Sequence, residues 1–114
     1  MSGWIAVDLD GTLAHYTGWQ GDHHIGDPVP LMLERVKQWL KDGKDVRIFT
    51  ARVCRSGADL VRTRMVIEHW CEKHLGRVIP ITNVKDFAMA ELWDDRCVQV
   101  IANTGKRADE EFLT

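Results

Sequence analysis

The residues of this chain best suited to chemistry are two aspartates with a single residue between them. Asp8 and Asp10 follow the short apolar run at residues 4–7, which predicts a buried strand. Burying charge is costly unless the charges have partners, so carboxylates at the end of such a strand indicate a site. Gly11 then lets the chain turn sharply. An acidic turn would explain the Asp-Gly pair alone, but two alternating acids directly after an apolar run are more specific.

Polar groups also stand at the ends of two later predicted strands. Thr50 closes an apolar strand over residues 45–50, and Asp94 and Asp95 close a short one over residues 90–93. A strand terminator and an exposed acidic turn are the plainer alternatives. Ligands of open α/β sheets bind at the carboxyl ends of the strands. We therefore expect these groups to converge on the two acids of the first strand.

Arg52 and Lys85 are candidate cations. Arg52 stands two residues beyond Thr50, and a guanidinium group is suited to phosphate oxygens. A surface arginine is an equally good interpretation. Lys85 is the only lysine in residues 74–105, within a stretch where a lone lysine is normally solvated.

The elements that hold these groups are predicted from hydrophobic periodicity and turn residues. Five strands are expected, over residues 4–7, 45–50, 78–82, 90–93 and 98–101. One helix follows Asp27, its expected cap, and ends at Gly43. A second runs over residues 56–74 and stops at Gly76. Pro80 suits an edge strand, because proline has no N–H to donate to a neighbouring strand.

Two further segments have no strong periodicity. Residues 14–27 are rich in Gly, His and Asp and are expected to form a loop or small hairpin, a flap beside the first strand's end. It contains Trp19, His23 and His24. Two solvated histidines are a somewhat better interpretation than catalytic ones, and the absence of a His-x-x-His clip disfavours zinc. The charged tail, residues 106–114, is expected to be a short helix or a frayed end.

Composition bounds the class of protein. The 114 residues suffice for one domain, with 45% apolar and 28% charged residues. The net charge, 15 minus 17 or −2, gives no general attraction to nucleic acid or anionic membranes, although it does not exclude a local basic groove. We expect no membrane span, no secretory signal and three reduced cysteines, hence a cytoplasmic domain over residues 1–114. Oligomeric state is left open.

The sequence DLDGTL at residues 8–13 resembles the first motif of the haloacid dehalogenase superfamily, in its phosphatase branch. The resemblance implies that Asp8 is a nucleophile that attacks phosphorus and forms an aspartyl-phosphate. It implies that Asp10 is first a general acid and then a general base. A carboxylate is a workable nucleophile toward a phosphoryl group when a metal and cations neutralise the developing charge.

The other motifs of that family match in order along nearly the whole chain. By the resemblance, Thr50 hydrogen-bonds a phosphate oxygen, and Lys85 bridges the nucleophile and the phosphate, with Arg77 and Arg96 as the nearest substitutes. The substrate-binding set is then Gly11, Thr50, Arg52 and Lys85. The implied cofactor is Mg²⁺, held by Asp8, the backbone carbonyl of Asp10 and Asp94, with Asp95 in support.

The resemblance also implies a fold and a reaction. The fold is a three-layer α/β/α sandwich with a mainly parallel five-stranded sheet, and it lacks a cap domain because residues 14–27 are too few for a separate core. The reaction is Mg²⁺-dependent phosphomonoester hydrolysis. FTAR at residues 49–52 and WDDR at residues 93–96 are similar to the phosphatase module of polynucleotide kinase-phosphatases, which favours a phosphorylated nucleic-acid end or nucleotide as substrate. A small sugar phosphate, and a non-catalytic binding domain of the same fold, are the alternatives.

Overall fold

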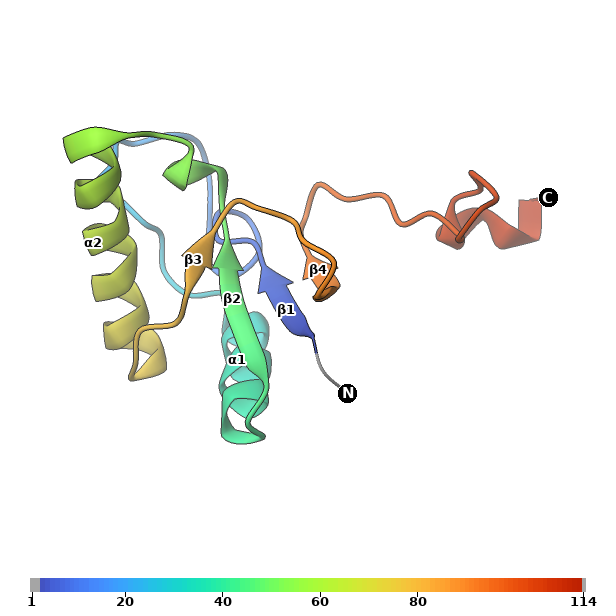
Figure 1. Cartoon of the computed structure of the whole chain (residues 1–114), viewed down its shortest axis with the longest axis horizontal. Coiled ribbons are helices and arrows are strands. Elements are labelled where there is room, and N and C mark those ends of the chain that lie inside the picture. The colour runs from blue at the N-terminus through green and yellow to red at the C-terminus, as the bar shows by residue number, and fades with distance from the viewer. Residues whose placement is uncertain (1–2, 114) are drawn as a thin grey trace.

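A parallel sheet organises the chain. The computed structural model describes residues 3–113 and shows four strands in the order β3-β2-β1-β4 (Figure 1). The strands are β1 Trp4–Val7, β2 Asp45–Phe49, β3 Ile81–Thr82 and β4 Met89–Trp93. Every pair is parallel, so the carboxyl ends of all four strands lie at one edge of the sheet. The α/β class and the parallel sheet predicted from the sequence are confirmed.

Two α-helices connect the first three strands, as predicted. They are α1 Pro30–Lys41, between β1 and β2, and α2 Gly57–Leu75, which follows β2 and the 3₁₀ turn η1 Ala51–Val53. The expected cap of the first helix is wrong: Val29 is the N-cap, with no side-chain hydrogen bond, and Pro30 begins the helix. A proline there loses nothing, because the first N–H groups of a helix have no intrahelical partner. Gly76 ends α2 with φ 80°, as its position predicts.

Both helices cover the same face of the sheet. Alternate strand residues share one core with residues of both helices: Ile5, Val7, Val46, Ile48 and Ile81 with Met32, Val36, Ile67, Trp70 and Cys71. Successive strand residues point to opposite faces, so this set defines a single helical side. Two right-handed crossovers that advance in one direction along the sheet give this arrangement (Figure 1). Residues 3–113 thus form two layers, and the expected three-layer sandwich is not seen.

The opposite face of the sheet is covered by side chains and by the loop that leads to β4. Trp4 is buried, and its indole N–H donates to Asp86 Oδ1 at 2.8 Å. The Arg47 guanidinium lies 4.6 Å from the Trp4 ring centroid, and the Phe49 ring centroid lies 6.4 Å from it. A cation and an aromatic ring therefore cover the indole where the expected third layer would have packed.

The prediction of a fifth strand over residues 98–101 is wrong. In Figure 1 the chain after β4 runs away from the sheet, and Val98 and Val100 are each more than half exposed. Asn103 and Gly105, both with positive φ, turn the segment back on itself. The Ile101 N–H then donates to the Lys106 carbonyl at 2.8 Å. This local hairpin satisfies backbone groups that a sheet strand would have paired with the sheet.

The third strand is shorter than predicted, and it lies at the edge as predicted. Only Ile81 and Thr82 form β3, although the Pro80 carbonyl accepts a hydrogen bond from the Ile48 N–H at 2.8 Å. Proline lacks the N–H that would extend the ladder, so strand pairing begins after it. Among the described residues, no helix has both the length and the apolar character that crossing a membrane requires.

Matched isoleucine truncations test the four-stranded core. Ile48→Ala removes a fully buried side chain, and we expect it to lower the free energy of unfolding by about 2–5 kcal/mol. Ile101→Ala makes the same chemical change in the exposed tail segment, where we expect a change within about 0.5 kcal/mol. Urea unfolding measures both. A large loss at Ile101 would show that residues 98–101 belong to the core.

Candidate active site

The turn after β1 separates its apolar from its polar side chains. Leu9 and Leu13 are fully buried and anchor the turn to the core. The Leu13 N–H donates to the Leu9 carbonyl at 3.0 Å, and the Gly11 N–H donates to the Ala14 carbonyl at 2.8 Å. The intervening polar side chains are thereby left to face the sheet edge.

Three carboxylates converge at this edge. One carboxylate oxygen from each of Asp8, Asp94 and Asp95 lies within 4.8 Å of the other two. The register of β1 and β4 causes this, because Val7 pairs with Trp93 and the Asp8 N–H donates to the Trp93 carbonyl at 2.9 Å. The acids that follow the two strands are therefore neighbours, as the sequence predicts.

Thr12 and Gly11 complete the packing of the cluster. The Thr12 hydroxyl lies 3.3 Å from Asp8 Oδ2 and 3.4 Å from Asp95 Oδ1, and it accepts a hydrogen bond from the Asp95 N–H at 3.0 Å. Gly11 has φ 92°, and a Cβ on it would lie 2.5 Å from Asp95 Oδ2. Position 11 therefore requires glycine for two reasons: the backbone conformation and the close approach of a carboxylate.

The cluster carries unneutralised like charge. Burial, chiefly, and then the charge of Asp94, raise the pKa of the Asp8 carboxyl to about 7, and Asp95 adds to the rise. The Thr12 hydroxyl acts in the opposite direction. Three close carboxylate oxygens suit a hard divalent cation such as Mg²⁺, which would remove the repulsion. The residues present thus fit the expected ion, while the Asp10 carbonyl and the order of Asp94 and Asp95 stay predictions.

The Asp10 side chain is held apart from this cluster by Arg52. Arg52 Nε and Nη2 donate to the two Asp10 oxygens at 2.7 and 2.9 Å, and Nη2 also donates to the His24 carbonyl at 2.8 Å. The Arg52 side chain is only 6% exposed. The arginine expected to bind substrate is thus engaged with the second acid and with the 14–27 loop. A bidentate pair of this kind fixes the carboxylate's orientation.

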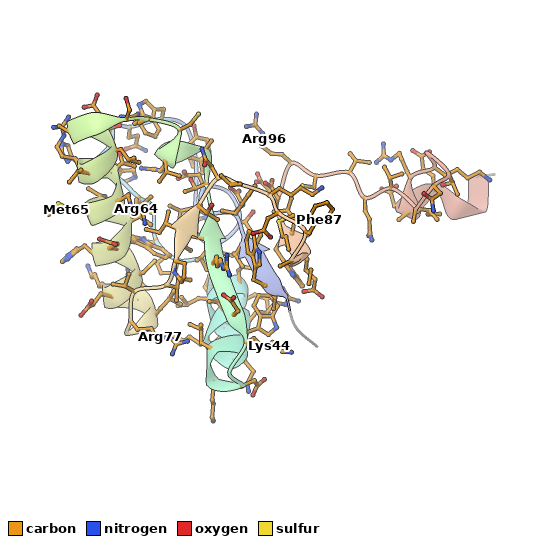
Figure 2. The ribbon with its side chains drawn as sticks, in the orientation of Figure 1. Lys44, Arg64, Met65, Arg77, Phe87 and Arg96 are labelled. Carbon is orange, nitrogen blue, oxygen red and sulfur yellow. The ribbon has the colours of Figure 1, made fainter. Side chains whose placement is uncertain are left out.

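The other predicted phosphate ligands differ in their placement. Thr50 is buried at the end of β2, and its hydroxyl accepts a hydrogen bond from the Arg52 N–H at 3.1 Å. Thr50 and Arg96 line the same cleft as the acids, whereas Lys85 is exposed and lies outside that lining. Figure 2 shows Arg96 at the carboxyl edge and Arg77 at the opposite end of the molecule. Arg96 therefore lines the cleft, and the role of Lys85 stays a prediction.

A cleft of about 740 Å³ opens over these groups. Its lining adds side chains that we did not assign from the sequence, namely Tyr16, Trp19, Cys54 and Arg55. The 14–27 loop that carries two of them has no α-helix and no β-strand, as predicted. The signal that could have found Tyr16 and Trp19 is the occurrence of large aromatic residues in a polar loop directly after residues 8–13.

Comparisons with known proteins bear on the fold alone. No family model matches the sequence, and no curated protein matches it. The chain is similar to a solved structure of a conserved protein coded by a locus of Bacteroides thetaiotaomicron, with a TM-score of 0.60 and 22% identity over 89% of this chain and 82% of that one. At this identity the similarity supports the α/β architecture only.

Replacing Asp94 tests the electrostatic state of the cluster. The pKa of Asp8 in the folded protein lies above its ordinary value of 3.8, so without metal the folded state loses stability as pH rises from about 4 to about 7. Asp94→Asn removes one repelling charge. We expect it to raise the melting temperature of the metal-free protein at pH 8 by roughly 4 °C, about 1 kcal/mol, and to weaken Mg²⁺ binding. Glu34→Gln, the same charge change on the exposed side of α1, should do neither. A metal-free Asp94→Asn protein that melts lower than wild type would contradict this.

Gly11→Ala tests the close approach of Asp95. We expect the new Cβ to displace the carboxylate and to reduce Mg²⁺ affinity at least about tenfold, as measured by calorimetric titration. Gly43→Ala is the control, because Gly43 also has positive φ, 80°, but faces open space. Both variants should lose stability from backbone strain, and only Gly11→Ala should lose the ion. Equal Mg²⁺ affinity in the two variants would count against the site.

Proposed function

We propose that this protein is a Mg²⁺-dependent phosphomonoester hydrolase that acts through an aspartyl-phosphate on Asp8. The convergence of Asp8 with Asp94 and Asp95, beside a separately held Asp10, carries the proposal. Asp8 lies beside two further acids, while Arg52 holds Asp10 apart from them, so the two acids can have different tasks. The expected relationship to haloacid dehalogenase phosphatases agrees with this division.

In the first step an Asp8 oxygen bonds to phosphorus while the ester bond to the leaving oxygen breaks. For Asp10 to give a proton to that oxygen, its carboxyl must be protonated and must release one of its two hydrogen bonds to Arg52; the alcohol then departs. In the second step Asp10 takes a proton from water, whose oxygen attacks the acyl-phosphate, and Asp8 is released with inorganic phosphate. Bound Mg²⁺ would supply positive charge to the phosphoryl oxygens.

In this proposal two groups of this chain contact the phosphoryl oxygens. The buried Thr50 hydroxyl, at the end of the neighbouring strand, has its hydrogen available for an oxygen of the substrate. In this proposal Arg96 supplies the cation that we expected from Lys85, because Arg96 lines the cleft. Its guanidinium can offer two parallel N–H groups to a phosphate, where a lysine offers a point charge.

The substrate alternatives remain those of the sequence analysis. The cleft has no cap domain over it among the described residues, which leaves room for a phosphorylated nucleic-acid end or a nucleotide as well as for a small sugar phosphate. A non-catalytic binding domain would retain the ion but not the turnover. Hydrolysis assays therefore distinguish the enzyme from the binding domain.

Hydrolysis of p-nitrophenyl phosphate tests the proposed reaction. We expect Mg²⁺-dependent release of p-nitrophenol that EDTA abolishes, and a loss of kcat of at least about 10³-fold in Asp8→Asn and in Asp10→Asn. Asp42→Asn, an exposed acid at the end of α1, should match wild type. Turnover that survives in Asp8→Asn would refute the covalent route. Mg²⁺ binding without turnover at any pH would indicate the binding domain.

A further inference from the structure

Two large aromatic side chains of the 14–27 loop line the same cleft as the acids. Trp19 is 52% exposed and Tyr16 is 48% exposed. Leaving an indole and a phenol ring half in water forfeits free energy that burial would provide. Exposed aromatic side chains gathered in a concave site with charged groups are typical of a surface that binds a ligand.

The Trp19 ring is held in place rather than left free. Two guanidinium groups lie against it, with Arg52 Cζ at 4.9 Å and Arg55 Cζ at 5.9 Å from the ring centroid. Arg55 is itself fixed by an ion pair with Asp22 at 2.7 Å, and Arg52 by its bond to the His24 carbonyl. The loop on the C-terminal side of Trp19 is thereby tied at two points. A pre-positioned ring loses little conformational entropy when it binds a ligand.

The position of Trp19 relates it to one half of the substrate. Arg52 contacts both the Asp10 carboxylate, at 2.7 Å, and the Trp19 ring. Asp10 is the group that protonates the leaving oxygen in the proposed reaction. The Arg52 guanidinium group therefore lies between the indole and Asp10, which is on the leaving-group side of the ester. Asp94 and Asp95 belong to the phosphoryl side. A ring attached to the leaving group would come against Trp19.

We propose that Trp19, with Tyr16 beside it in the cleft lining, selects phosphate esters whose leaving group carries a planar aromatic base, as in a nucleotide. This inference rests on the proposed function and names its substrate class. Stacking of a base on an aromatic side chain is sequence-tolerant and contributes about 1–3 kcal/mol. The same chemistry occurs in a free nucleoside monophosphate and at a phosphorylated end of a polynucleotide. Arg55 and Arg96, which also line the cleft, can meet the additional phosphates of the second source.

Specificity ratios test this proposal. The substrates are adenosine monophosphate, a 3′-phosphorylated oligonucleotide and glycerol phosphate, which has no ring. We expect wild type to give its highest kcat/KM with one of the two base-bearing substrates, and which one identifies the source. Trp19→Ala should lower kcat/KM for that substrate about 5- to 150-fold and for glycerol phosphate less than about twofold. Trp19→Phe should keep most of the preference, because it retains a ring.

An exposed aromatic residue outside the cleft provides the control. Phe87 is fully exposed in the loop before β4, and it lies outside the cleft lining (Figure 2). Phe87→Ala should leave every ratio unchanged. An equal loss on all three substrates in Trp19→Ala would mean that the indole only holds the loop, and it would overturn the proposal. So would a wild-type preference for glycerol phosphate.

A binding measurement separates this proposal from the proposed function. Calorimetric titration of adenosine monophosphate into Asp8→Asn protein with Mg²⁺ needs no turnover. We expect the additional Trp19→Ala change to weaken binding about 5- to 150-fold, and unchanged binding would overturn the stacking role. Failure of hydrolysis with every substrate, together with Trp19-dependent binding, would refute the hydrolase and keep the base-recognition site.

Discussion

The repulsion among three carboxylates at the end of the β1–β4 pair is the constraint on which the site depends. Parallel pairing of Val7 with Trp93 places the acids that follow these strands side by side, whatever their charge. The fold stabilises this arrangement by burying Leu9 and Leu13 beneath the turn. Burial, chiefly, and then the charge of Asp94 raise the pKa of Asp8. In the proposed function, a bound divalent cation would offset this repulsion.

A second interaction, the ion pair with Arg52, keeps the Asp10 side chain out of the cluster. Asp8 and Asp10 are two residues apart, yet Asp10 is bound by Arg52 from the segment after β2. The same arginine reaches the 14–27 loop through the His24 carbonyl and the Trp19 ring. The orientation of Asp10 and the position of the loop are therefore coupled through one buried guanidinium group. In the proposed function, catalysis and substrate recognition would both depend on this guanidinium group.

The sequence predicts those parts of the structure that local pattern and strand order determine. Apolar runs that end in polar residues located β1, β2 and β4, and parallel order then placed Asp8 beside Asp94. Long-range side-chain contacts that strand order does not determine were not predictable in this way. The partner of Arg52 is an acid 42 residues earlier in the chain, and a phosphate would have suited its guanidinium equally well. The run at residues 98–101 looked like a strand, but a local hairpin satisfied its backbone.

Crystallography with Mn²⁺ in place of Mg²⁺ is the most direct test that one cation is shared by the acids of two neighbouring strands. Carboxylate sites that bind Mg²⁺ also bind Mn²⁺, whose anomalous scattering distinguishes the ion from a water molecule. The account predicts a single strong peak in contact with a carboxylate oxygen of Asp8 and with one of Asp94 or Asp95. A peak elsewhere, or one that excludes Asp8, would contradict it.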